Sequence, residues 1–102
     1  MTEPLYTRIT GNVSNQILIT KGGDYSGSIN NMTIVNENNS NTLTVTLDLY
    51  DGTDIKAVLH KQLVIPPGMT IVLDQSYIRF NSKKYSLRIT TTGSADSTII
   101  IK

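Results

Sequence analysis

Few side chains in this 102-residue sequence have the types and spacing that catalysis requires. His60 is the only histidine, and the chain contains no cysteine. General-base or nucleophilic catalysis by a histidine needs a serine, cysteine or carboxylate placed beside it. No catalytic motif surrounds His60, and its neighbours Lys56 and Lys61 favour a solvent-facing position. We therefore expect a protein that is not an enzyme.

Three carboxylates, Asp48, Asp51 and Asp54, lie close together in the sequence and could ligate a hard cation through oxygen. Their spacing does not match the regular calcium loop of EF-hand proteins. Aspartate and glycine at a hairpin turn are explained more simply by turn capping. Residues 21–27 are rich in glycine but lack the Gly-Lys-Ser/Thr ending of a phosphate loop. We expect no metal and no cofactor.

Arg79, Lys83, Lys84 and Arg88 form the only cluster of basic residues. The cluster could contact an acidic protein surface or a phosphate, so we consider its four residues candidates for partner binding. A solvated hairpin end is the simpler explanation. The net charge of +1 lacks the broad positive footprint of a nucleic-acid-binding protein, so we expect no nucleic-acid partner.

The elements that position these residues follow from a two-residue period. In Thr42–Tyr50 the odd positions are Leu, Val, Leu and Leu, and the even positions are Thr, Thr, Thr, Asp and Tyr. This alternation predicts a half-buried strand with one apolar face and one polar face. No window shows the 3.6-residue apolar stripe of a helix, so the sequence predicts an all-β protein.

Similar short strands with polar turns between them recur along the chain. They are predicted at 7–10, 15–20, 31–35, 42–50, 55–60 with a resumption at 63–65, 69–74, 78–80, 85–90 and 97–101. About eight antiparallel strands at this spacing are typical of a single β-sandwich. The Cys…Trp…Cys core of immunoglobulin domains is absent, so a jelly-roll-like sandwich is preferred over an immunoglobulin-like one.

The length indicates one domain, which we place at residues 7–102, preceded by an N-terminal arm at residues 1–6. Pro4 discourages a central strand in the arm. The arm residues Pro4, Leu5 and Tyr6 are candidates for binding a neighbouring subunit. No stretch approaches the ~18 apolar residues that span a bilayer, and the first residues do not resemble a signal peptide.

The last predicted strand contains three consecutive isoleucines, Ile99 to Ile101, and is therefore apolar on both faces. Either both faces are covered within the domain, or one face meets another subunit. Ile100 is the candidate contact residue. This pattern predicts a homo-oligomer, for which a trimer is one possibility.

The order of strands and turns resembles that of small virion proteins of tailed bacteriophages, over most of residues 29–102. The matching features are the strand Met32–Val35 ending in Asn36, the alternating strand Thr42–Leu49, the turn Ile65–Gly68, the strand Met69–Leu73, and a final hairpin of Tyr85–Thr91 and Ser97–Lys102. The turn at Asn81–Lys84 departs from the small, glycine-containing turn of that family.

The resemblance implies a β-sandwich that decorates or cements a capsid, with the major capsid protein or another virion protein as its partner. It implies no catalytic residues. The expected location is the virion, assembled in the host cytoplasm. Two alternatives remain open: a component of the neck or tail, and a receptor- or carbohydrate-binding module. The second would use exposed tyrosines and the loop at residues 36–41.

Overall fold

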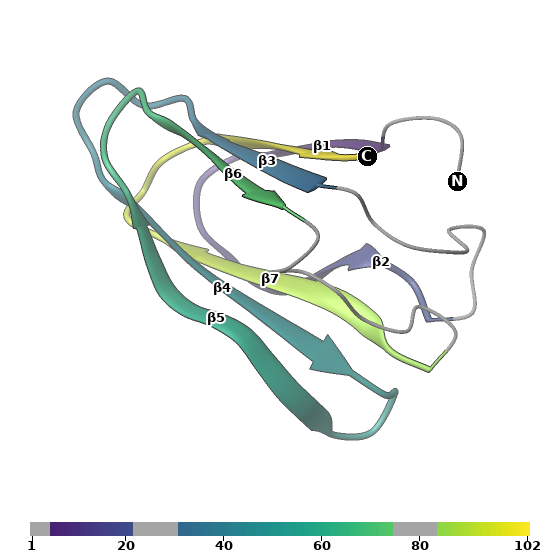
Figure 1. Cartoon of the computed structure of the whole chain (residues 1–102). Helices are drawn as coiled ribbons and strands as arrows, with labels where there is room; N and C mark the ends of the chain where they lie inside the picture. The colour runs from purple at the N-terminus through teal and green to yellow at the C-terminus, as the bar shows by residue number, and fades with distance from the viewer. Residues whose placement is uncertain (1–4, 22–30, 75–83) are drawn as a thin grey trace.

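The computed structural model describes residues 5–21, 31–74 and 84–102. These residues form two four-stranded antiparallel sheets, which pack face to face (Figure 1). The strands are β1 (Leu5–Ile9), β2 (Val13–Ile19), β3 (Asn31–Asn36), β4 (Leu43–Tyr50), β5 (Ile55–Ile65), β6 (Thr70–Asp74), β7 (Ser86–Thr92) and β8 (Ser97–Ile101). The predicted all-β sandwich is confirmed. The predicted strand 78–80 lies outside the described residues.

The two sheets arise from one long hairpin whose tip lies between β4 and β5. Around this tip β4 pairs with β5, β3 with β6, β2 with β7, and β1 with β8, all antiparallel. The strand orders are β1-β8-β3-β6 in sheet A and β2-β7-β4-β5 in sheet B. Folding such a nested hairpin over itself gives the double-sheet jelly roll. The preference for a jelly roll over an immunoglobulin-like sandwich is confirmed.

The core lies between the sheets and consists of the aliphatic half of each alternating strand. In β4 the predicted inward residues Leu43, Val45 and Leu47 are all 0% exposed. The largest fully buried side chains come from both sheets: Ile9, Met32, Ile34, Leu43, Val45, Leu47, Ile65, Leu87, Ile89, Ile99 and Ile101. At about 1.5–3 kcal/mol for each fully buried aliphatic side chain, this layer is the main source of stability.

Strand β5 differs from the sequence prediction, because it runs without a break from Ile55 to Ile65. Its pairing with β4 shifts register three times, and Gln62 adopts a φ of 55°. Each shift inserts an extra residue into β5, so the simple alternation of inward and outward side chains is lost. Ile55, predicted to share a face with Leu59, is therefore 54% exposed.

The boundary of the predicted N-terminal arm is wrong, because Leu5 and Tyr6 already belong to β1. They pair with Ile101 and Ile100 of β8, and Leu5 packs against the core. Strand β8 in turn lies between β1 and β3 and is not an edge of the sheet. Ile99 and Ile101 are fully buried, and only Ile100 faces outward from this strand among its three isoleucines.

At one end of the sandwich the chain crosses four times between the sheets, and the buried amide of Asn36 joins two of these crossings, β3–β4 and β5–β6. Asn36 Nδ2 donates to the carbonyl oxygens of Asn41 (2.9 Å), Ile65 (3.0 Å) and Pro66 (3.2 Å). Asn36 Oδ1 accepts a hydrogen bond from the Asn38 N–H at 3.0 Å. One side chain at the end of β3 thus binds the end of β5 in the opposite sheet.

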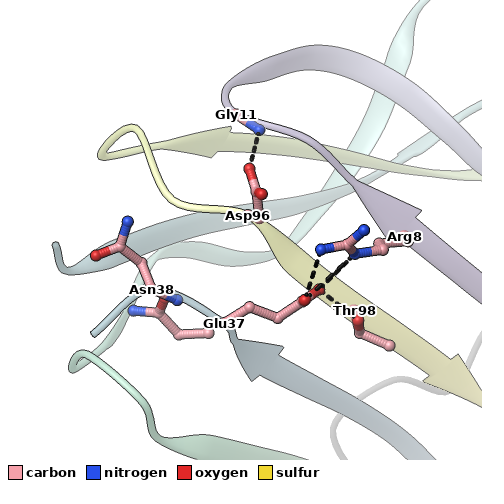
Figure 2. A network of polar contacts seen from close by, with 7 residues as sticks. Arg8, Gly11, Glu37, Asn38, Asp96 and Thr98 are labelled. Atoms are coloured by element: carbon pink, nitrogen blue, oxygen red, sulfur yellow. Dashed lines mark hydrogen bonds and ion pairs between the residues drawn. The ribbon is translucent and has the colours of Figure 1, made fainter. Parts of the chain in front are cut away.

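Asp96 ties two more loops to this end. Its Oδ1 accepts from the Gly11 N–H at 2.8 Å, as Figure 2 shows, and its carbonyl oxygen accepts from the Glu37 N–H at 2.9 Å. Gly93, with a φ of 111°, lies against the Thr42 carbonyl, where any Cβ would clash. The loops at this end form one hydrogen-bonded cap.

We predict that Asn36→Ala lowers the free energy of unfolding by about 1–3 kcal/mol or more, because it leaves buried backbone groups without partners. Ser97→Ala is the matched control. Ser97 is the register partner of Asn36 and is fully buried, but its Oγ has no hydrogen-bond partner among the described residues. Because this hydroxyl makes no hydrogen bond, its removal leaves no buried group without a partner and should cost much less than Asn36→Ala. Urea unfolding of both variants measures the difference, and equal losses would contradict the role given to Asn36.

Candidate interaction surface

The outer face of sheet A carries a row of mostly apolar side chains that crosses all four strands. Tyr6, Ile100, Thr33 and Val72 are successive register partners on β1, β8, β3 and β6. Tyr6 is 67% exposed and Val72 is 59% exposed. We call these four residues the apolar row. Contiguous exposed apolar surface of this kind marks sites of protein–protein contact.

The next row on the same face is polar except for Val35 on β3, and an ion pair lies at its β1 end. Arg8 Nη2 donates to Glu37 Oε1 at 3.0 Å, and Arg8 Nε lies 3.1 Å from Glu37 Oε2. Thr98, the register partner of Arg8, donates from Oγ1 to Glu37 Oε2 at 2.6 Å. Figure 2 shows Arg8 and Thr98 converging on this carboxylate from neighbouring strands.

The contacts between Arg8, Thr98 and Glu37 determine the charge of the groups beside the apolar row. Hydrogen bonds from Arg8 and then from Thr98 hold the pKa of the Glu37 carboxyl below its usual value of 4.5. The same contact with Glu37 raises the pKa of Arg8. Both groups are therefore charged at neutral pH and neutralise each other. The apolar row is bordered on this side by a preorganised, net-neutral ion pair.

Sheet B presents a different outer face. Its exposed aliphatic side chains are Ile17 on β2 and Ile55, Val58 and Val64 on β5, at the two edges of the sheet. The central strands place Thr44, Thr46 and Thr90 between these edges. On sheet B, threonines on both central strands therefore separate the exposed aliphatic side chains, whereas on sheet A only Thr33 lies between Ile100 and Val72.

Arg88 does not belong to a solvent-facing basic cluster, and this part of the sequence prediction is wrong. Its side chain is buried on the outer side of β7, where Nε lies 2.8 Å from Asp48 Oδ1. The ring centroid of Tyr50 lies 4.1 Å from the guanidinium carbon. Arg88 and Asp48 are register partners on adjacent strands, and the sequence pattern did not reveal that both are covered.

The other predicted partner-binding residues divide into three groups. Tyr6 and Ile100 lie side by side in the apolar row, and Lys84 is exposed just before β7. Leu5 points inward and packs against the core, so it is not available as a contact residue. Pro4, Arg79 and Lys83 lie outside the described residues.

The residues that we considered as metal ligands or catalytic groups take part in the turn and strand structure of sheet B. Asp51 Oδ1 accepts from the N–H groups of Thr53 and Asp54, both at 2.8 Å, which caps the β4–β5 turn. These bonds lower the pKa of Asp51. His60 is half-buried in β5 opposite Leu47.

Residues 5–21, 31–74 and 84–102 contain no group of three side chains suited to a metal ion. Nor does this part of the chain contain a helix long and apolar enough to cross a membrane.

Sequence reasoning missed Val72, Arg8 and Glu37 as surface residues of interest. Alternation in β6 does place Val72 opposite in direction to Ile71 and Leu73, so its outward orientation could have been inferred. That it aligns with Tyr6 depends on pairings between strands far apart in the sequence. The Arg8–Glu37 contact depends on the same pairings.

We predict that Arg88→Met or Asp48→Leu alone lowers the free energy of unfolding by about 3–5 kcal/mol, because each change leaves a buried charge without its partner. The double variant should recover much of this loss, since no buried charge remains. A double-mutant cycle in urea measures the coupling. Additive losses in the double variant would contradict a buried, coupled pair.

We also predict that Glu37→Gln lowers stability at pH 7 and has little effect near pH 3. Because the folded pKa of Glu37 is depressed, its charge stabilises the fold above the unfolded pKa, and this contribution disappears as the pH falls through the folded value. Added salt should reduce the difference, since the pair is exposed. Thermal unfolding of wild type and variant at both pH values is the measurement. A pH-independent difference would show that the carboxylate charge is not responsible.

No model of a protein family matches this sequence, and no curated protein is similar to it. Among solved structures, that of PirA matches with a TM-score of 0.50 and 13% identity, and the alignment covers 100% of this chain and 95% of PirA. At this identity the likeness concerns the fold alone.

A structure of infectious bursal disease virus, Gx strain, matches with a TM-score of 0.43 and 13% identity, over 97% of this chain and 33% of that chain. The CBM22-1–GH10 modules of xylanase 10B from Clostridium thermocellum, in complex with xylohexaose, match with a TM-score of 0.38 and 15% identity, over 86% of this chain and 18% of that chain. Neither match is close enough to bear on function. The whole chain shares its sandwich fold with PirA, and its function has to be argued from its own surface.

Proposed function

We propose that this chain is a non-enzymatic structural protein of a tailed-phage virion, which binds the capsid lattice through the outer face of sheet A. The observation that carries the proposal is the apolar row, whose Tyr6 and Val72 remain 67% and 59% exposed on a face that the core does not use. Tyrosine beside aliphatic side chains is typical of the centre of a protein–protein contact.

The charges around the row fit a protein partner better than a nucleic acid. Arg8 is neutralised by Glu37, and Asp74 and Lys102 contribute one charge of each sign at the other end of the face. Binding to phosphates would call for a surplus of cations. On a repeating capsid surface each contact can be of modest affinity, because an oligomer gains from binding several sites at once.

The loop at residues 36–41 gives little support to the carbohydrate-binding alternative, because its asparagine side chains are used in hydrogen bonds within the protein. The amides of Asn36 and Asn41 donate to backbone carbonyls, and Asn38 Oδ1 accepts from two backbone N–H groups of the loop. These side chains hold the loop in shape. Tyr50 stacks on Arg88, which leaves Tyr6 as the exposed tyrosine of the described strands.

The test is co-sedimentation of the purified protein with capsids of the phage that encodes it. We predict stoichiometric binding at a copy number that matches the capsid symmetry. Tyr6→Ser should weaken binding roughly 10- to 30-fold, as expected for an aromatic residue at the centre of a contact. Ile17→Ser, at a 49% exposed position on the outer face of sheet B, is the matched control and should bind like wild type.

The absence of capsid binding would reject the proposal, and binding to purified tails or to a glycan array would then favour one of the alternatives. Capsid binding that is lost in Ile17→Ser but kept in Tyr6→Ser would contradict the assignment to sheet A. Circular dichroism of both variants excludes unfolding as the cause.

A further inference from the structure

The four edge strands of the sandwich differ in how well they are protected against pairing with another strand. Strands β2 and β5 contain register shifts, with Asn15 and Gln62 at positive φ. Strand β1 carries the charged Arg8 beside its centre. Bulges and charges of this kind are the usual protection of exposed edges.

Strand β6 contains no bulge, and its one charged residue, Asp74, lies at its end. Its five residues pair with β3 in unbroken register, and the stretch from Thr70 to Leu73 contains no charge, glycine or proline. Among the described strands β3 is its only partner. A regular, apolar, uncharged edge of this type is a template for one more strand.

The hydrogen-bond phase shows which groups of β6 point to the open side. The Asn36 N–H donates to the Met69 carbonyl oxygen at 2.9 Å, which makes Met69 a hydrogen-bonded partner of β3. Because such pairs alternate along an antiparallel ladder, Ile71 and Leu73 also bond to β3. The backbone N–H and C=O groups of Thr70 and Val72 therefore point away from β3, as does the backbone of Asp74.

The sequence of β6 is complementary to itself about Val72. In an antiparallel pair centred on this residue, Val72 faces the partner copy's Val72, Ile71 faces Leu73, and Thr70 faces Asp74. Two aliphatic pairs then lie toward the cores. A two-fold axis through Val72 gives both copies the same set of residue pairs.

We propose that β6 is a self-association edge, through which two copies of this chain join their A sheets into one continuous antiparallel sheet. Val72 exchanges both backbone hydrogen bonds with its counterpart at the two-fold axis. The apolar row of one copy then continues into that of the second. This association needs only the free protein, so it stands or falls independently of capsid binding.

The first test uses the absence of cysteine from the chain, which makes any introduced thiol unique. In a hydrogen-bonded antiparallel pair the Cα atoms are about 5.5 Å apart, within the range of about 4.4–6.8 Å that a disulfide spans. Val72→Cys should therefore give a covalent dimer on mild oxidation. Val64→Cys is the matched control, because Val64 on the edge strand β5 has the same 59% exposure. Equal cross-linking of the two variants would overturn the proposal.

The second test measures mass in solution without capsids. Wild type should sediment at twice the chain mass of 11.2 kDa at high concentration and dissociate on dilution. Val72→Pro removes an N–H that β3 does not use, so the protein should stay folded but become monomeric. Val72→Thr keeps the N–H and should still dimerise. A wild type that is monomeric throughout the dilution series, or a Val72→Pro variant that is folded and dimeric, would overturn the proposal.

Discussion

The buried amide of Asn36 is the contact on which the arrangement of the two sheets most depends. In a nested hairpin every connection other than the one between β4 and β5 passes from one sheet to the other. Such crossings bring backbone carbonyls to the end of the core, where they lose water and need donors. Asn36 donates to the carbonyls of Ile65 and Pro66, so it joins the end of β3 to the end of β5. An aliphatic side chain at this position would fill the space but remove both of these hydrogen bonds, of which the one to Ile65 is buried.

The alternating strands direct one half of their side chains into the core and the other half toward the outer faces of the sheets. The inward aliphatic residues form the core and are needed for folding. The outward residues of sheet A are not needed for it, yet Tyr6, Ile100 and Val72 keep apolar surface in contact with water. On the outer side of sheet B, by contrast, the Arg88–Asp48 pair is covered and serves stability. The exposed aliphatic side chains of sheet B lie at its two edges, whereas the row on sheet A crosses all four strands, and for this reason we propose that partner binding uses sheet A.

The sequence predicted the strands well wherever the two-residue period was unbroken. Strands β3, β4 and β8 were placed within one residue at either end, because alternation and polar turns define them locally. Strand β5 was divided wrongly, since its bulges depend on the partner strand β4. The absence of disulfide and tryptophan signals was enough to prefer the jelly roll over the immunoglobulin-like sandwich.

The candidate surface was harder to predict, because it forms through the pairing of strands far apart in the sequence, which the alternation within one strand does not reveal. Tyr6 and Ile100 were each selected as contact residues, but for unrelated reasons: one from an expected arm and one from an apolar strand. Only the β1–β8 register shows that they are neighbours. Arg88 was misassigned for the same reason. Its burial depends on Asp48 and Tyr50 across the sheet, and a charge in a sequence does not show whether another strand covers it.

If sheet A presents its outer face to the capsid, as we propose, thiols on that face should be shielded from labelling in the particle-bound protein. Thr33→Cys places a single thiol in the middle of the apolar row, and Thr44→Cys places one on the outer face of sheet B; both positions are half-buried in the free chain. We predict that capsid binding slows alkylation at position 33 and leaves it unchanged at position 44. Protection at position 44 with free reaction at position 33 would contradict it.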